Sequence, residues 1–167
     1  MSIKKLCFAF CIVLFSGGCV TDEEPRSYVM PGDTLPYFSV VMDDGEPLTT
    51  DSLRGAPSLV MFFTTGCSDC RAALPVVQAL HEERPELRVV CISRQEGASE
   101  IETYWRDNHL TLPYSAQTDR RVYSFFASSG VPRIYTVGSR LTVTATFDDS
   151  SIPTLEQLVN VLYGESI

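Results

Sequence analysis

The chain has 167 residues, enough for one domain with a hydrophobic core of its own. Hydrophobic residues make up 44% of the sequence, which excludes a disordered protein. The formal net charge of −8 excludes nucleic acid as an expected partner, because binding to phosphates needs clustered lysine and arginine side chains.

Residues 1–18 have the pattern of a lipoprotein-type signal peptide. Two lysines supply a charged start, and the apolar run 6–15 is much shorter than the roughly 20 residues of a membrane-spanning helix. Small residues directly before Cys19 resemble the bacterial lipobox, where cleavage leaves that cysteine N-terminal and lipidated. Ser16 departs from the lipobox pattern, which usually has leucine or a similar residue there. An ordinary secretory signal is the alternative.

A tether is expected over residues 19–33 and one folded domain over residues 34–167. The tether holds two prolines and a glycine among charged residues, which disfavours regular structure. Its start, VTDEEP, resembles signals that send some bacterial lipoproteins to the cell surface, and a solvated charge cluster explains it equally well. We expect an exported protein of the bacterial cell envelope, anchored through lipid on Cys19 on the periplasmic side or the outer surface.

The first half of the expected domain contains a hairpin, a buried strand and a helix. The run 38–42 is strand-like, and the Asp-Asp-Gly sequence after it is typical of a hairpin turn. Residues 58–63 form a short continuous apolar run, the pattern of a strand buried on both faces. A helix is expected over residues 68–84, with one apolar stripe and a bend at Pro75.

The second half alternates strands and helices. Ser99 and Glu102 predict a capping box, and Gly138 with Ser139 predicts a tight turn between two strands. We expect strands at residues 87–93, 110–116, 133–137 and 141–147, the second of them short. We expect helices at residues 99–108, 119–126 and 154–163. This order predicts an α/β fold, a mixed sheet with helices on both faces.

Two cysteines three positions apart, Cys67 and Cys70, follow the first buried strand directly. Residues at that spacing on a helix have Cβ atoms about 5–6 Å apart, close enough for a disulfide after slight adjustment. At the helix N-terminus, unpaired backbone N–H groups and the helix dipole lower the pKa of a thiol. We therefore expect Cys67 to be the nucleophile and Cys70 to be the resolving thiol. Cys91, in the next buried strand, is expected to be inert.

The cysteine pair and its surroundings resemble the thioredoxin superfamily, and most closely the exported thiol–disulfide oxidoreductases of the TlpA and ResA type. Pro75, five positions after Cys70, matches the family's helix-kinking proline. Val131–Pro132, before a late strand, matches its cis-proline, and residues 94–118 match the insertion of this subgroup. The resemblance covers residues 33–165 and implies a thioredoxin-like three-layer sandwich.

The resemblance also implies roles for Val131 and Pro132. A cis bond before Pro132 would turn the N–H and C=O of Val131 toward the disulfide, to bind an extended segment of a substrate. The family picture adds that this proline keeps metal away from the thiols. A trans proline that starts a strand is the alternative. The expected partners are envelope proteins that exchange disulfides or dithiols, and no cofactor or metal is expected.

The sequence departs from the family at three positions. Gly66 stands where a tryptophan is usual, Met61 replaces the buried aspartate of thioredoxins, and Ala73 replaces the glutamate of ResA-type proteins. The usual acid–base helper is therefore missing. Asp69 is either a substitute proton acceptor or an exposed carboxylate favoured by the helix dipole. Its charge opposes a thiolate on Cys67, so we expect it to make the couple more reducing.

Three other functions stay open at this point. The spacing of Thr64 and Cys67 resembles the T-x-x-C of peroxiredoxins, which are thiol peroxidases, but the proline expected just upstream is missing. A C-x-x-C pair is half of a zinc site, yet the sequence has no second pair and no H-x-x-x-H. A lipoprotein with a merely structural disulfide is disfavoured, because so short a loop adds little stability. The leading prediction is a thiol–disulfide oxidoreductase of the cell envelope.

Overall fold

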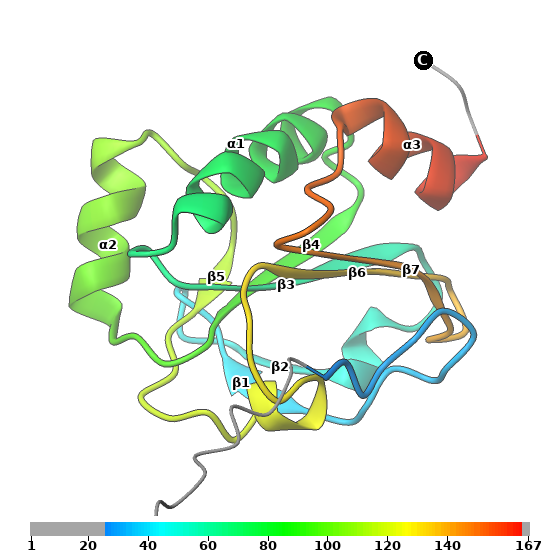
Figure 1. The fold of residues 1–167 in the computed structure, drawn as a ribbon, viewed down its shortest axis with the longest axis horizontal. Helices are drawn as coiled ribbons and strands as arrows, with labels where there is room; N and C mark the ends of the chain where they lie inside the picture. Colours follow the sequence, from blue (N-terminus) through cyan, green and yellow to red (C-terminus); the bar gives the residue numbers. More distant parts are fainter. Residues whose placement is uncertain (1–25, 165–167) are drawn as a thin grey trace, which may run out of the picture.

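The computed structural model describes residues 26–164, and its centre is a five-stranded sheet in the order β5–β4–β3–β6–β7 (Figure 1). Strand β3 runs parallel to β4 and antiparallel to β6, so the sheet is mixed. The strands are β3 (Ser58–Phe63), β4 (Arg88–Ser93), β5 (Tyr114–Ser115), β6 (Arg133–Val137) and β7 (Val143–Asp148). The predicted signal peptide and Cys19 lie outside the described residues.

Two layers cover the sheet. Helices α1 (Ser68–Glu83) and α3 (Leu155–Tyr163) lie on one face, and α2 (Ala98–Asp107) lies beside the β5 edge (Figure 1). The hairpin β1 (Ser39–Val41) and β2 (Pro47–Thr49) and two 3₁₀ turns, η1 (Thr50–Leu53) and η2 (Tyr123–Phe125), cover the other face. The predicted three-layer fold with a mixed sheet is confirmed, although 3₁₀ turns rather than α-helices lie on the second face.

Strand β3 supplies core side chains to both layers, because successive residues of a strand point to opposite faces. All six of its residues are buried. Phe62 packs on Phe126 with ring centroids 4.6 Å apart, while Phe63 packs on Trp105 of α2 at 4.9 Å. Burial on both faces explains why the sequence of this strand is apolar throughout.

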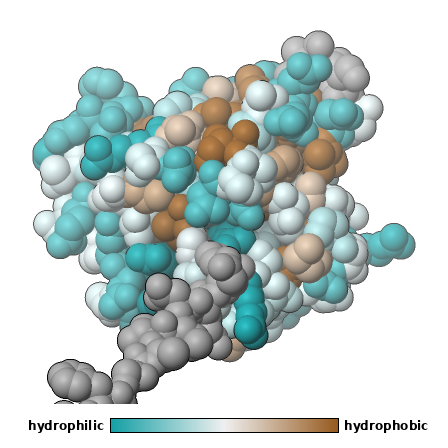
Figure 2. All heavy atoms as spheres, viewed as in Figure 1, coloured by the Kyte–Doolittle hydropathy of each residue, from teal (hydrophilic) through white to brown (hydrophobic). Residues whose placement is uncertain are grey.

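Apolar residues also gather around the α1 and α3 layer, whereas polar residues cover the side formed by α2 (Figure 2). Val76 of α1 and Leu155 and Leu162 of α3 are partly buried against the core. The two helices thus share one apolar seam above the sheet. No helix within residues 26–164 is long and apolar enough to cross a bilayer.

The helix predicted over residues 119–126 is wrong, because this segment forms only the short turn η2. Its end is bound to the N-terminal residues instead: Tyr28 N–H donates to the carbonyl of Phe126, and Ser128 N–H donates to that of Arg26, at 2.8 and 2.9 Å. So short a segment cannot sustain an α-helix by itself, and these backbone partners stop its extension.

Two helix and turn details also differ from prediction. The N-cap of α2 is Gly97, which has no side chain that could cap the helix. The predicted capping box of Ser99 and Glu102 is therefore wrong. Strand β7 begins at Val143 because the turn before it is wider than two residues and places Leu141 at φ 66°.

Residues 26–33 pack on the domain, so the described fold begins before the expected boundary at residue 34. Gly32 N–H donates to the carbonyl of Val143, and Val143 N–H donates to the carbonyl of Asp33, at 2.8 and 2.9 Å. Val29 is buried. The C-terminal part of the expected tether is therefore an integral part of the fold.

Candidate active site

Cys67 is the N-cap of helix α1 and lies at the edge of the sheet where β3 ends. Its backbone is extended, with φ −84° and ψ 127°, and its carbonyl accepts the N–H of Arg71 at 3.1 Å. Cys70 lies one turn deeper and is fully buried, whereas Cys67 is only half-buried. Both are free thiols, and a hydrogen bond connects their side chains. The more accessible sulfur is thus the one at the helix start.

Burial raises the pKa of the Cys70 thiol above its ordinary value of 9.0. A backbone hydrogen bond with Thr64 acts in the opposite direction. The hydrogen bond with Cys67 and the negative charges of Cys67 and Asp69 raise the pKa further. The buried thiol of Cys70 therefore keeps its proton at neutral pH, and Cys67 is the more accessible cysteine of the two.

The Val131–Pro132 peptide bond is cis, and Val131 contacts Cys67. The sulfur of Cys67 donates a hydrogen bond of 3.2 Å to the carbonyl of Val131. Val131 and Pro132 are both buried. Within residues 26–164, no group accepts a hydrogen bond from the N–H of Val131. This backbone donor is therefore an exception among the described residues, since buried N–H groups are nearly always paired.

A carboxylate that sequence reasoning missed holds the turn before Cys67. Thr65 donates its N–H and its hydroxyl to the two oxygens of Glu96, at 2.7 and 3.0 Å. Glu96 N–H in turn donates to the hydroxyl of Ser93 at 3.2 Å. Arg71 donates to the carbonyl of Thr65 at 2.9 Å. No local pattern marks Glu96, because Thr65 lies 31 positions away in the sequence.

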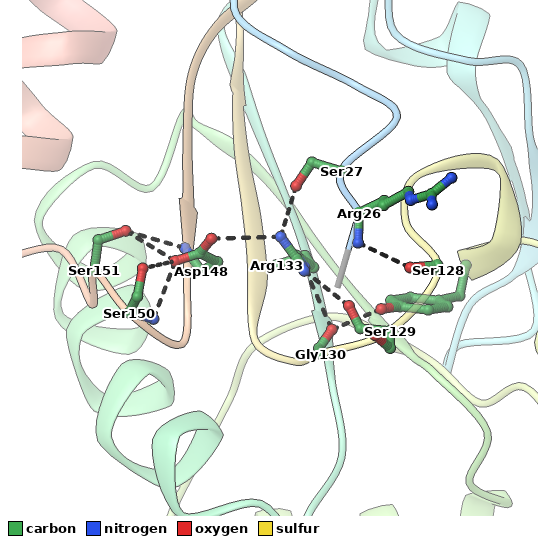
Figure 3. A network of polar contacts seen from close by, with 10 residues as sticks. Arg26, Ser27, Ser128, Ser129, Gly130, Arg133, Asp148, Ser150 and Ser151 are labelled. Atoms are coloured by element: carbon green, nitrogen blue, oxygen red, sulfur yellow. Dashed lines mark hydrogen bonds and ion pairs between the residues drawn. The ribbon is translucent and has the colours of Figure 1, made fainter. Parts of the chain in front are cut away.

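A second polar network holds the backbone just before the cis bond (Figure 3). Arg133 is 4% exposed and donates to the carbonyl of Ser129 at 2.8 Å and to the hydroxyl of Ser27 at 2.7 Å. It also forms an ion pair of 3.4 Å with Asp148. The hydroxyl of Ser150 donates to Asp148 and is the main cause that lowers the pKa of this carboxyl. No short motif in the sequence marks Arg133 or Asp148.

The positions that depart from the resembled family lie around the cysteines. Met61 and Ala73, the two positions at which the resemblance led us to look for a carboxylate, are fully buried. Gly66 is exposed, and Asp69 is partly exposed at the first turn of α1. Within the described part of the chain, no group of three or more His, Cys, Asp or Glu side chains is arranged to hold a metal ion.

Solved structures from several bacteria share this fold. The thioredoxin domain of a thiol–disulfide oxidoreductase from Bacteroides vulgatus has a TM-score of 0.67 and 17% identity, covering 81% of this chain and 97% of that chain. A secreted disulfide oxidoreductase of Mycobacterium tuberculosis has a TM-score of 0.67 and 17% identity, covering 77% and 96%. Peroxidoxin BcpB of the same organism has a TM-score of 0.65 and 15% identity, covering 81% and 95%. The thioredoxin-like fold is therefore established.

A comparison with curated proteins found no match. Residues 31–146, however, match the sequence profile of the AhpC/TSA family. The matched range spans more than half of the chain and contains both cysteines of the pair and the cis-proline. The chain therefore belongs to the AhpC/TSA family.

Proposed function

We propose that this protein is a thiol–disulfide oxidoreductase of the TlpA and ResA type, which exchanges disulfides with partner proteins through Cys67 and Cys70. The hydrogen bond between the Cys67 sulfur and the Val131 carbonyl, at 3.2 Å, carries the proposal. It sets the accessible thiol directly beside an unpaired backbone N–H, which is the arrangement needed to hold a polypeptide while its disulfide reacts.

The reaction has two exchange steps. The Cys67 thiolate attacks one sulfur of the partner's disulfide, and the other partner sulfur leaves as a thiolate that takes up a proton. Cys70 then loses its proton and attacks the sulfur of Cys67, which forms the Cys67–Cys70 disulfide and releases the second partner thiol. Two electrons pass from the dithiol to the partner. The same steps in reverse oxidise a partner dithiol.

Val131 binds the partner as an added strand in this proposal. Its N–H donates to a carbonyl of the partner segment, and its C=O accepts a partner N–H. In the free protein that C=O accepts the S–H of Cys67. Loss of the thiol proton therefore frees the carbonyl for the partner at the moment when the sulfur becomes nucleophilic.

We further propose that the protein acts in the bacterial cell envelope, exported by residues 1–18 and anchored by lipid on Cys19. The signal-like N-terminus supports this location, as does the likeness to a secreted disulfide oxidoreductase. Labelling of cells with radioactive palmitate tests the anchor. The full chain should incorporate label and the Cys19→Ser variant should not, whereas equal labelling of both would refute lipidation at this residue.

A thiol peroxidase is the second candidate, favoured by the AhpC/TSA match and by the likeness to a peroxidoxin. In that reaction the Cys67 thiolate attacks a peroxide oxygen, hydroxide leaves, and Cys70 converts the sulfenic acid to a disulfide with loss of water. Among the described residues, the groups bonded to the Cys67 sulfur are the Val131 carbonyl and the Cys70 thiol. Neither is a cationic group that would stabilise the leaving hydroxide, so disulfide exchange is the better supported function.

An assay with two alternative oxidants separates these functions. The full chain is given dithiothreitol as reductant and either oxidised insulin or hydrogen peroxide as substrate. We expect catalysed reduction of insulin that is lost in Cys67→Ser and retained in Cys91→Ala, because Cys91 is a buried thiol outside the site. Catalysed turnover of peroxide without reduction of insulin would establish the second candidate instead.

A further inference from the structure

The loop that leads to Val131 is held by three side chains through consecutive carbonyl groups. Each of the three carbonyls before Val131 accepts a hydrogen bond from an arginine or a tyrosine. The pairs are Arg120 with Ser128 at 2.6 Å, Arg133 with Ser129 at 2.8 Å, and Tyr123 with Gly130 at 2.7 Å. We call Arg120, Tyr123 and Arg133 the carbonyl clamp.

Arg133 is the buried member of the clamp, and stability alone does not account for it. Its side chain is only 5% exposed, whereas the side chain of its ion-pair partner Asp148 is 34% exposed. The charged nitrogen and oxygen of this pair lie 3.4 Å apart. A buried charge costs more to desolvate than such a pair returns, and an apolar residue of similar size is often as stabilising. The remaining donors of Arg133 go to Ser27 and to the loop carbonyls of Ser129 and Gly130 (Figure 3).

Gly130 shows that the loop is built around this guanidinium. Its φ of +84° lies in the left-handed region that favours glycine. A Cβ added there would lie 3.1 Å from an Arg133 nitrogen, tighter than normal contacts. Two side chains, Tyr123 and Arg133, donate to the carbonyl of this one residue, at 2.7 and 3.4 Å. The backbone directly before Val131 is therefore held in one conformation.

The clamp members come from both sides of the loop. Tyr123 belongs to η2, Arg120 lies just before that turn, and Arg133 is the first residue of β6. The guanidinium of Arg120 also lies over the ring of Tyr123, 5.3 Å from its centroid. Hydrogen bonds thus connect the loop both to β6 of the central sheet and to the layer that contains η2.

We propose that the carbonyl clamp positions Val131 for the partner polypeptide, an inference that rests on the proposed function. The clamp residues are positioning residues, because their contacts are to the loop and not to either sulfur. A loop already fixed in its binding conformation loses little conformational freedom when a partner strand adds to it. The clamp should therefore matter for disulfides within an extended polypeptide and not for a small disulfide that binds no backbone.

The test compares these two kinds of substrate in the full chain. Oxidised insulin is the polypeptide, and dithiodipyridine is the small disulfide. We expect Arg133→Met to raise the KM for insulin about tenfold, the equivalent of one hydrogen bond to a charged group. Arg120→Met removes a donor on an exposed side chain and Tyr123→Phe removes a neutral donor, so each should raise it by a smaller factor, about threefold. All three should react with dithiodipyridine at the wild-type rate.

Thr136→Val is the matched control. Thr136 is buried in β6, the strand that Arg133 begins, and its hydroxyl bonds that of Thr144 at 2.7 Å, away from the loop. This variant should lose stability without any change in the ratio of the two rates. Arg120 is exposed, so Arg120→Met keeps the test valid even where Arg133→Met does not fold.

Two results would overturn the role of the clamp in a protein that does reduce insulin. One is an insulin KM that is unchanged in Arg120→Met and Tyr123→Phe. The other is an equal loss of rate with insulin and dithiodipyridine. Failure of the proposed function looks different, because the wild-type chain would then leave insulin disulfides intact while its thiols still react with dithiodipyridine.

Discussion

Cys67 and Val131 are joined by a hydrogen bond of 3.2 Å from sulfur to carbonyl oxygen, although 64 positions separate them in the chain. The pairing of β3 with β6 explains this proximity. The two strands are antiparallel neighbours, with Phe62 opposite Arg133. The residues that follow β3 and those that precede β6 must therefore meet at one edge of the sheet. That edge holds together the Cys67 thiol and the Val131 backbone, on which the proposed function rests.

Asp69→Asn should raise the reduction potential of the Cys67–Cys70 couple by about 10–30 mV. Asp69 lies in the first turn of α1, two positions after Cys67, so its negative charge opposes a thiolate on Cys67 in the reduced protein. Its removal stabilises the reduced form, and a more stable reduced form means a higher potential. Equilibration with glutathione buffers measures the shift. Asp107→Asn, an exposed change on α2, is the control, and an unchanged or lower potential in Asp69→Asn would refute the account.

Glu96→Gln should destabilise the protein by about 1–2 kcal/mol and slow disulfide exchange, because an amide cannot accept both hydrogen bonds of Thr65. The turn before Cys67 would then lose one of the two hydrogen bonds that connect Thr65 to residue 96. Urea unfolding gives the free energy, and insulin reduction gives the rate. Glu102→Gln, on the exposed side of α2, should change neither quantity. Equal effects of the two substitutions on stability and rate would refute a specific role for Glu96 in holding the turn before Cys67.

Release of the partner should become faster as the pH rises, by about tenfold per pH unit below the pKa of Cys70. Only the thiolate attacks the mixed disulfide, and burial raises the pKa of this thiol above 9.0. A mixed disulfide formed on Cys67 can be isolated at low pH and its decay followed after a jump to each higher pH. A rate that levels off near neutral pH would contradict a raised pKa for Cys70.

Asp148 should contribute to stability only above acidic pH. Its folded-state pKa is lowered, chiefly by the hydroxyl of Ser150, so the contribution is present above the ordinary value of 3.8. It is lost as the pH falls through the lower folded-state value. Asp148→Asn should therefore be less stable than wild type at neutral pH, and the two unfolding free energies should converge in strong acid. A difference that persists unchanged in acid would contradict this assignment.

Local patterns predicted the elements whose cause is local. The apolar run 58–63 and the helix that begins at Ser68 have the expected starts, because burial on both faces and amphipathic spacing are visible within a few residues. The cis bond at Pro132 agrees with the family resemblance rather than with any spacing rule. These features include Cys67 and the loop that ends at Pro132, so the candidate site could be outlined from the sequence.

The features that the sequence did not predict depend on distant partners. The segment 119–126 stops short of a helix because residues 26–28 bind its end. Glu96 acts on Thr65 from 31 positions away, and Arg133 contacts Ser27 from 106 positions away. No periodicity or short motif records such contacts, because they exist only once the sheet has assembled.

Trapping with Cys70→Ser tests the central claim most directly. This variant keeps the attacking thiol and lacks the resolving one, so exchange should stop at a mixed disulfide on Cys67. Incubation with an envelope extract should give adducts that dithiothreitol releases, that mass spectrometry maps to Cys67, and that are missing in the Cys67→Ser Cys70→Ser double variant. Recovery of no reducible adduct on Cys67, from the extract or from oxidised insulin, would contradict the account.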